Sequence, residues 1–144
     1  MIRIRRAGET DLPAVIRLQH QLGPHEPPMS HDDAVAIFAL MQSYPDNVVY
    51  VAEADGAIVG TFTLLVMDKL GHGKPAGLVE DVVVDEAHRG TGIGAEMMRF
   101  AMEHCRQRGC YKLALSSNAL RTGAHAFYER LGFQKHGLSF LIDL

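Results

Sequence analysis

A β-branched strand and a glycine-rich turn follow one another directly in residues 78–94, which read LVEDVVVDEAHRGTGIG. The first part, Leu78–Val84, is typical of a central strand that is covered on both faces. The last part, Arg89–Gly94, brings three glycines to the point where the strand gives way to a helix. The first N–H groups of a helix have no intrahelical acceptor, and glycine lets the backbone approach a ligand closely. Arg89–Gly94, here called the cradle, is therefore predicted to bind an anionic phosphate, with the charge of Arg89 at its edge.

Other interpretations fit the cradle less well. A mononucleotide P-loop requires Lys-Ser or Lys-Thr after the last glycine, but Ala95 and Glu96 stand there. A dinucleotide fingerprint can be fitted to Gly90, Gly92 and Ala95, yet it expects an acidic residue at the end of the next strand, where residues 115–117 are Leu-Ser-Ser. A turn without any ligand is the remaining alternative, but so many glycines weaken a helix start without a gain in packing.

Two adjacent carboxylates, Glu80 and Asp81, interrupt the apolar strand before the cradle. In a strand covered on both faces they would be costly to bury unless they are paired or reach a solvated cleft. Strand alternation predicts that they point to opposite faces, so that at most one lines a cleft directly while the other pairs with a basic side chain. A salt-bridged or edge-exposed pair without any catalytic role is the alternative.

The whole chain is predicted to form one α/β domain, residues 1–144, with a mixed (α+β) central sheet of six or seven strands. Strands are indicated by alternating or β-branched runs, helices by a 3.6-residue apolar period, and one hairpin by the pair Asp55-Gly56. The expected order is β-α-α-β-β-β-α-β-α-β. Strands are expected at residues 1–6, 78–84 and 111–115, with two more between 48 and 67 and one or two within 133–144. Helices are expected at about 10–22, 30–41, 91–108 and 123–131. The sheet is expected to split between the parallel strands 78–84 and 111–115.

Composition restricts the class of protein. The chain has 144 residues, of which 47% are hydrophobic and 22% charged, as in a compact globular domain. A formal net charge of −3 argues against a partner that is bound through neutralised phosphates, so no nucleic acid is expected. Apolar runs such as Ala57–Met67 reach about half of the 20 residues of a membrane span, and the N-terminal residues are typical of a strand rather than a signal peptide. We therefore expect a cytoplasmic protein without a membrane partner.

Metal and disulfide chemistry are not indicated. Cys105 and Cys110 are too few for a disulfide framework and lack the spacing of a zinc site, so both are expected to be reduced. The eight histidines include no His-Glu-x-x-His pair, so no metal is predicted. His25, in a proline-rich loop, and His72, in a glycine-rich loop, are candidates to line a substrate site.

A third signal follows the predicted strand 111–115. Asn118 comes just after the end of the strand, where side chains commonly reach a ligand that is bound across the sheet. The next helix carries Phe127 and Tyr128 and is followed by Leu131-Gly132-Phe133. Taken alone, Tyr128 could equally be a core aromatic on the inner face of that helix.

Together the three signals resemble the GCN5-related N-acetyltransferase (GNAT) superfamily over essentially the whole chain. The cradle is similar to its acetyl-CoA pyrophosphate motif, residues 80–84 to the preceding strand, and residues 118–133 to its Asn and Phe-Tyr-Glu-x-x-Gly-Phe element. The resemblance implies the acyl-CoA N-acyltransferase fold with acetyl-CoA as co-substrate. The residues that it assigns to acetyl-CoA are Val82, Val83, Val84, Arg89, Gly90, Thr91, Gly92, Ile93, Gly94, Asn118, Phe127 and Tyr128.

The resemblance also implies a mechanism. Glu80 matches the carboxylate that takes the proton of the substrate ammonium, and Tyr128 matches the phenol that protonates the sulfur of coenzyme A. The amine would attack the thioester directly, without a covalent enzyme intermediate. On the substrate side the candidates are Glu80, Asp81, His25 and His72.

Two subfamilies resemble this chain most. Residues 115–128 are similar to aminoalkylphosphonate N-acetyltransferases, and residues 80–84 with 109–112 to glucosamine-6-phosphate N-acetyltransferases, whose basic C-terminal residue has no counterpart in residues 140–144. Both indicate a small primary amine. The alternatives are an enzyme that acts on protein N-terminal or lysine amines, and a non-catalytic acetyl-CoA sensor or partner subunit, which would not need the pair of Glu80 and Tyr128. The apolar run Leu138–Ile142 prompts the expectation of a homodimer.

Overall fold

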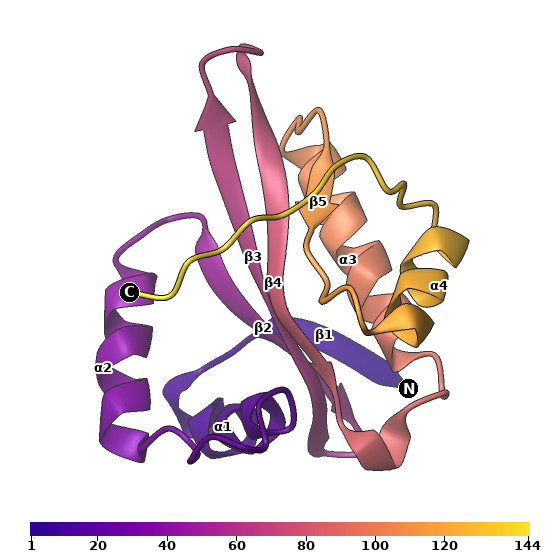
Figure 1. Cartoon of the computed structure of the whole chain (residues 1–144). Helices are drawn as coiled ribbons and strands as arrows, with labels where there is room; N and C mark the ends of the chain where they lie inside the picture. The colour runs from indigo at the N-terminus through magenta and orange to yellow at the C-terminus, as the bar shows by residue number, and fades with distance from the viewer. The chain divides into compact units, whose positions relative to one another are not determined.

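The computed structural model describes residues 1–144, which form two compact units, residues 1–114 and residues 115–144. Figure 1 shows the elements of the chain from the N-terminus to the C-terminus. The first unit holds most of the sheet and three α-helices, and the second holds the end of the last strand and the fourth α-helix.

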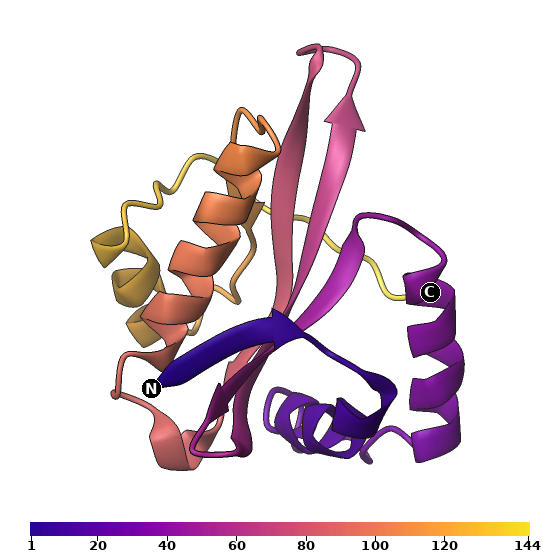
Figure 2. The same ribbon diagram turned by 180° about the vertical axis from the view of Figure 1, so that it is seen from behind.

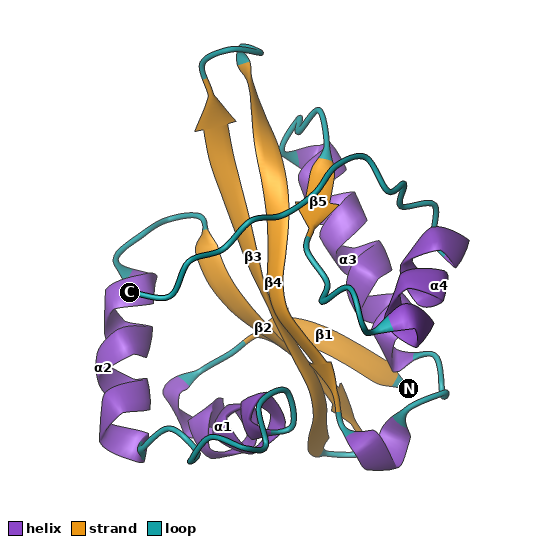
Figure 3. Ribbon diagram, viewed as in Figure 1, coloured by secondary structure: helices purple, strands orange, loops and turns teal.

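The first unit is built on a five-stranded sheet with the order β1-β2-β3-β4-β5 (Figure 3). β1 pairs antiparallel with β2, β2 with β3, and β3 with β4. The N–H of Gly77 donates to the carbonyl of Lys112 at 2.9 Å and the N–H of Tyr111 to that of Pro75 at 3.0 Å, with both chains running in the same direction. The sheet is therefore mixed, as predicted, but it has five strands rather than six or seven. The strands are β1 Ile2–Arg6, β2 Asn47–Ala54, β3 Ala57–Lys69, β4 Lys74–Val84 and β5 Leu113–Leu115.

Local sequence signals set the ends of several elements. The Oγ of Ser30 accepts the N–H of Asp33 at 3.1 Å and caps the second helix. Asp55 and Gly56 both have positive φ, 51° and 78°, as the two-residue turn between β2 and β3 requires. The helices of the first unit are α1 Leu12–His20, α2 His31–Gln42 and α3 Ile93–Gln107, with short 3₁₀ turns at Glu9–Asp11 and Glu86–His88. None of the helices combines the length and the apolar character that crossing a bilayer needs.

Helix α3 packs on the sheet through an apolar face. In both ribbon views α1 and α2 lie to one side of the sheet and α3 to the other (Figure 2). Met97, Met98 and Ala101 of α3 are fully buried. A Cβ at Gly77 of β4 would overlap the sulfur of Cys105, so the glycine allows α3 to approach the strand closely. This packing fixes the start of α3 relative to the end of β4, and the cradle connects the two.

The second unit contains α4, Thr122–Arg130, and a C-terminal segment, residues 133–144, without regular structure. The strands predicted within residues 133–144 do not form, so the expected order lacks its last strand. Leu138, Phe140 and Ile142 occupy alternate positions, with the apolar Leu141 between the last two, and they are 84%, 90% and 81% exposed. A strand forms only where a neighbouring strand satisfies its N–H and C=O groups and another surface covers its apolar face.

Candidate active site

A β-bulge lies in the middle of β4, at the two carboxylates. Thr63 of β3 is opposite Glu80, but Thr61 is opposite Val83, so β4 carries one extra residue there. Asp81 has a φ of 53°, a left-handed conformation that is uncommon for a residue other than glycine. The expected alternation of Glu80 and Asp81 is wrong at this point, because the bulge breaks the period of two and both residues are exposed.

The pKa of the Glu80 carboxyl lies above that of an ordinary glutamate. Partial burial raises its pKa, and the negative charge of the adjacent Asp81 raises it further. A carboxylate with a raised pKa accepts a proton more readily, which suits a general base. Neither Glu80 nor Asp81 forms a salt bridge, so the expected pairing of one of them with a basic side chain is wrong.

Beyond the bulge, β4 runs on toward the cradle. β5 has three residues against eleven in β4, so a part of β4 has no strand on its β5 side. The parallel hydrogen bonds lie near the start of β4, at Pro75 and Gly77. The unpaired part is therefore at its end, where Val82–Val84 lie, and backbone groups there are left for a ligand.

The cradle has the backbone that the sequence predicts. Gly90 and Gly92 have φ of 78° and 89°, and α3 begins immediately afterwards at Ile93. No atom lies within 4 Å of a Cβ placed on either glycine, so each is required by its conformation and not by crowding. No side chain caps α3, so its first N–H groups have no side-chain partner, and these groups and the positive end of the helix dipole would suit an anion.

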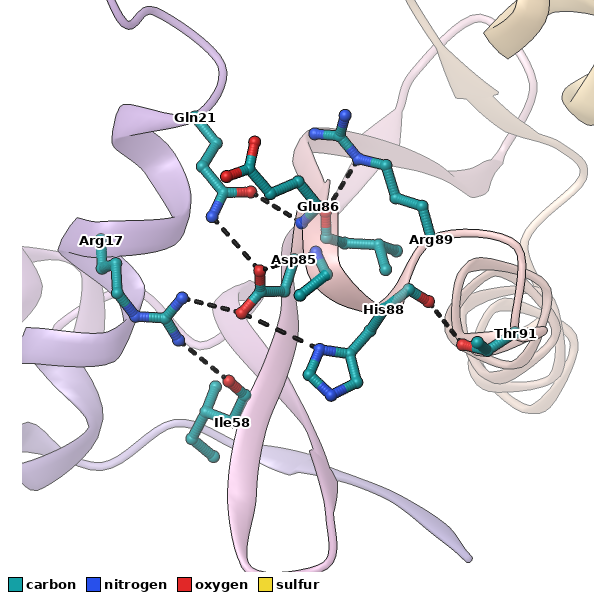
Figure 4. A network of polar contacts seen from close by, with 10 residues as sticks. Arg17, Gln21, Ile58, Asp85, Glu86, His88, Arg89 and Thr91 are labelled. Carbon is teal, nitrogen blue, oxygen red and sulfur yellow. Dashed lines mark hydrogen bonds and ion pairs between the residues drawn. The ribbon is translucent and has the colours of Figure 1, made fainter.

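Two side chains of the cradle brace the turn. The Nε of Arg89 donates to the carbonyl of Val84 at 3.3 Å, which leaves both terminal nitrogens of its guanidinium for a diphosphate (Figure 4). The hydroxyl of Thr91 donates to the carbonyl of His88 at 2.5 Å. Arg89 and Thr91 are both exposed.

Asp85, which follows β4, ties helix α1 to the turn that leads into the cradle (Figure 4). Its carboxylate accepts hydrogen bonds from Nη1 of Arg17 at 2.8 Å, from Nε2 of Gln21 at 3.4 Å and from the backbone N–H of Ala87 at 3.2 Å. The Oε1 of Gln21 in turn accepts the N–H of Glu86 at 3.1 Å. The Arg17 guanidinium holds the pKa of Asp85 below its usual range, against the opposing effect of burial. Two side chains of the α1 region thus fix the start of the turn.

Helix α1 also reaches the bulge. The Nε2 of Gln19 donates to the carbonyl of Asp81 at 3.3 Å, which supports the left-handed residue. Sequence reasoning missed Gln19, Arg17, Gln21 and Asp85 as parts of the site. A signal existed only for Asp85, whose carboxylate caps the 3₁₀ turn at Glu86–His88 as an Asp at an N-cap commonly does. The partners on α1 lie more than sixty positions earlier in the chain, and no local pattern reveals them.

The second unit carries the remaining motif residues. The Oδ1 of Asn118 accepts the N–H of Leu120 at 2.9 Å, and its backbone carbonyl lies 2.8 Å from Nε2 of His125. Tyr128 packs edge-on against Phe127 and Phe133, at centroid distances of 5.1 and 5.7 Å. Burial raises the pKa of the Tyr128 phenol, so the group stays protonated and able to donate a proton at neutral pH.

The two candidate histidines lie in exposed loops of the first unit. His25 is in the connection between α1 and α2. His72 is in the turn between β3 and β4, where its ring stacks on Tyr111 at 4.0 Å. At a rise of about 3.3 Å per residue, the six steps along β4 from Lys74 to Glu80 span roughly 20 Å, so the structure does not bring His72 beside Glu80. No group of three potential metal-ligating side chains is present.

Comparisons with known proteins agree with this geometry. The model of the acetyltransferase (GNAT) family matches residues 13–133. The glucosamine 6-phosphate N-acetyltransferase of Trypanosoma brucei is 34% identical to this chain, and the alignment covers 99% of this chain and 96% of that protein. The aminoalkylphosphonate N-acetyltransferase of Salmonella typhimurium is 35% identical over 65% of this chain and 62% of its own length. The crystal structure of glucosamine-6-phosphate N-acetyltransferase from Arabidopsis thaliana superimposes with a TM-score of 0.87 at 29% identity, covering 99% of this chain and 98% of that one.

Proposed function

The chain belongs to the GNAT family of acetyltransferases, and from that premise we propose that it transfers the acetyl group of acetyl-CoA to the primary amine of a small molecule. The observation that carries the proposal is the cradle, where two left-handed glycines lead into an uncapped helix directly after a strand with unpaired backbone groups. The family model spans both compact units. We therefore propose that residues 1–144 act as one catalytic domain.

Acetyl-CoA would be held by backbone groups more than by side chains. The diphosphate would bind the N–H groups at the start of α3 and the guanidinium of Arg89. The pantetheine arm would run along Val82–Val84 as an additional strand. Asn118 and Phe127 of the second unit are the further residues that the family resemblance assigns to acetyl-CoA. Bound in this way, acetyl-CoA supplies an activated thioester, and the residues of the chain supply orientation and proton transfer.

Direct transfer requires the nitrogen to lose two protons and the sulfur to gain one. An amine is protonated at neutral pH, so Glu80 would remove one proton from the ammonium, directly or through a water, and free the lone pair. The freed amine would attack the thioester carbonyl, whose oxygen would accept hydrogen bonds from backbone N–H groups of residues 82–84. As the carbon–sulfur bond breaks, the Tyr128 phenol would donate its proton to the departing thiolate, and the second proton of the nitrogen would leave through solvent and restore the phenol. Asp81, beside Glu80, would attract the cationic substrate before it loses its proton.

The acceptor that we propose is a small primary amine that also carries a phosphate or phosphonate group. The support is that the names of two relatives, a glucosamine 6-phosphate and an aminoalkylphosphonate N-acetyltransferase, share this chemistry. The test is the release of free coenzyme A thiol with glucosamine 6-phosphate, 2-aminoethylphosphonate, glucosamine and a lysine-containing peptide. We expect kcat/KM to be highest for one of the first two. Turnover of the peptide alone would contradict the proposal, and so would acetyl-CoA binding without turnover of any amine.

We also propose a homodimer through the C-terminal segment. The support is its strand-like alternation of exposed apolar residues, Leu138, Phe140 and Ile142, which a strand of a second copy could pair and cover. Light scattering should give the mass of a dimer at micromolar concentration. A strict monomer at high micromolar concentration would refute the dimer and leave the fold intact.

A further inference from the structure

The only two cysteines of the chain lie at matched positions of one helix ending, where α3 stops. Gly109 follows the helix with a φ of 74°. The N–H of Cys110 donates to the carbonyl of Cys105 at 2.9 Å, and that of Gly109 to the carbonyl of Arg106 at 3.0 Å. This pair of bonds defines a Schellman motif, which brings the side chains of its first and last residues into contact. Here those residues are Cys105 and Cys110.

The geometry of the motif suits a disulfide. A backbone hydrogen bond joins the two residues directly, so standard backbone dimensions keep their Cα atoms within about 7 Å even in the most extended arrangement. Bent arrangements bring the Cα atoms into the range of about 4.4–6.8 Å that disulfides span. The two thiols are also close enough that the Cys110 thiol raises the pKa of Cys105. Ring closure therefore asks for little movement of the backbone.

The two thiols differ in access. Cys105 is buried on the sheet beside Gly77, and burial together with the neighbouring Cys110 thiol raises the pKa of Cys105 to about 12. Cys110 is only partly buried. An external reagent therefore reaches Cys110 first, whereas Cys105 can react only with a group already attached to its neighbour.

We propose that Cys105 and Cys110 form an exchangeable dithiol, a modification site that takes a low-molecular-weight disulfide. The Cys110 thiolate attacks one sulfur of the disulfide, forms a mixed disulfide and releases the first thiolate. Cys105 loses its proton to solvent and attacks the Cys110 sulfur, which closes the Cys105–Cys110 disulfide and releases the second thiolate. One small disulfide is reduced to two thiols for each protein dithiol oxidised. Neither cysteine takes part in acetyl transfer, so this site is independent of the proposed function.

The test is oxidation of the reduced full-length chain by glutathione disulfide, followed by acid quenching and mass spectrometry. Wild type is expected to lose two hydrogens. Arg106 and Arg108 lie between the cysteines, so trypsin separates peptides 100–106 and 109–112, which stay joined only by the disulfide. Recovery of this linked pair supports the proposal. A wild type that stays reduced, or that stops with one glutathione on Cys110, overturns it.

Two variants check the order of the steps. Cys105→Ser removes the resolving thiol and is expected to accumulate the mixed disulfide on Cys110, whereas Cys110→Ser is expected to stay unmodified while it is folded. For wild type, closure of the ring should accelerate about tenfold per pH unit between about pH 7 and 9, since the thiolate of Cys105 is the scarce reactant. Modification of Cys110→Ser at the wild-type rate, or a closure rate that does not depend on pH, contradicts the proposed order. Tryptic mapping of wild type still tests for the disulfide where a variant fails to fold.

Discussion

Two segments of the chain differ in whether neighbouring residues satisfy their backbone groups and cover their apolar side chains. One runs from β4 through the cradle to α3, and the other is the C-terminal segment of residues 133–144. Each must satisfy backbone N–H and C=O groups. In the first, β3 pairs with β4, Arg89 and Thr91 bond nearby carbonyls, and α3 packs on the sheet. In the second, Leu138, Phe140 and Ile142 stay exposed and no strand forms. The first segment is complete with the residues around it, while the second has the pattern of a strand without the partner that a strand needs.

Because of this difference, ligand binding at the cradle can be tested separately from the proposed role of the second unit. The first segment contains the cradle, which we propose binds an anion, and its glycines, caps and ion pairs can be tested one at a time. The second unit supplies Tyr128, whose proposed chemistry should be separable from binding at the cradle. The variants below remove one feature each, in order of decreasing expected effect.

The largest effect is expected from Tyr128→Phe. The variant keeps the ring and its packing against Phe127 and Phe133 but loses the proton donor. We expect kcat to fall by roughly 10²–10⁴, with little change in the dissociation constant of acetyl-CoA or in stability. Steady-state kinetics and acetyl-CoA titration check both parts. A variant with near-normal kcat would make Tyr128 a packing residue and leave the second unit without a proven role in catalysis.

Glu80→Gln should be next, with a loss of about 10²-fold in kcat/KM near neutral pH. Without a base, the reaction must wait for amine that solvent has already deprotonated, so the rate should recover as the pH rises toward the pKa of the amine. In wild type, activity should fall as the pH drops through the raised pKa of Glu80, because the protonated carboxyl cannot act as a base. A pH profile of Glu80→Gln that matches wild type would remove Glu80 from the mechanism.

Gly92→Ala tests the backbone of the cradle. A side chain at a φ of 89° costs about 1–2 kcal/mol, so we expect a loss of that size in unfolding free energy or a rise of about tenfold in the dissociation constant of acetyl-CoA. The matched control is Gly123→Ala in α4, which has open space and no positive φ and should leave both quantities nearly unchanged. Equal behaviour of the two variants would show that the cradle does not need its left-handed glycine.

The smallest effect is expected from Asp85→Asn, which weakens the link between α1 and the cradle. Because Asp85 touches the turn and not the ligand, KM for acetyl-CoA should rise about fivefold while kcat changes less. The folded-state pKa of Asp85 is lowered, so this difference between wild type and variant should be present above the usual aspartate pKa and vanish as the pH falls through the lowered value. Asp46→Asn is the control, because Asp46 pairs with Arg108 at the opposite end of α3. An equal rise in KM for both variants would argue against a specific role for Asp85.

How far the sequence predicts this molecule depends on the range of the interactions involved. The cradle, the Ser30 cap and the Asp55-Gly56 turn depend on residues a few positions apart, and the structure has all three. No local pattern predicts the bulge at Asp81, because its support comes from the pairing with β3 and from Gln19 on α1. The prediction of one or two C-terminal strands within residues 133–144 rests on the apolar residues of this segment alone. That pattern specifies which side chains need cover, but it contains no information on whether a partner is present.

The central claim is that the cradle binds acetyl-CoA, and thermal unfolding with three ligands tests it most directly. Acetyl-CoA at a hundredfold its dissociation constant should add roughly 2.7 kcal/mol of stability. NADH and ATP should add none, because the cradle lacks the lysine of a P-loop and the acidic residue that would bind a ribose. Stabilisation by NADH or ATP without any by acetyl-CoA would contradict the account.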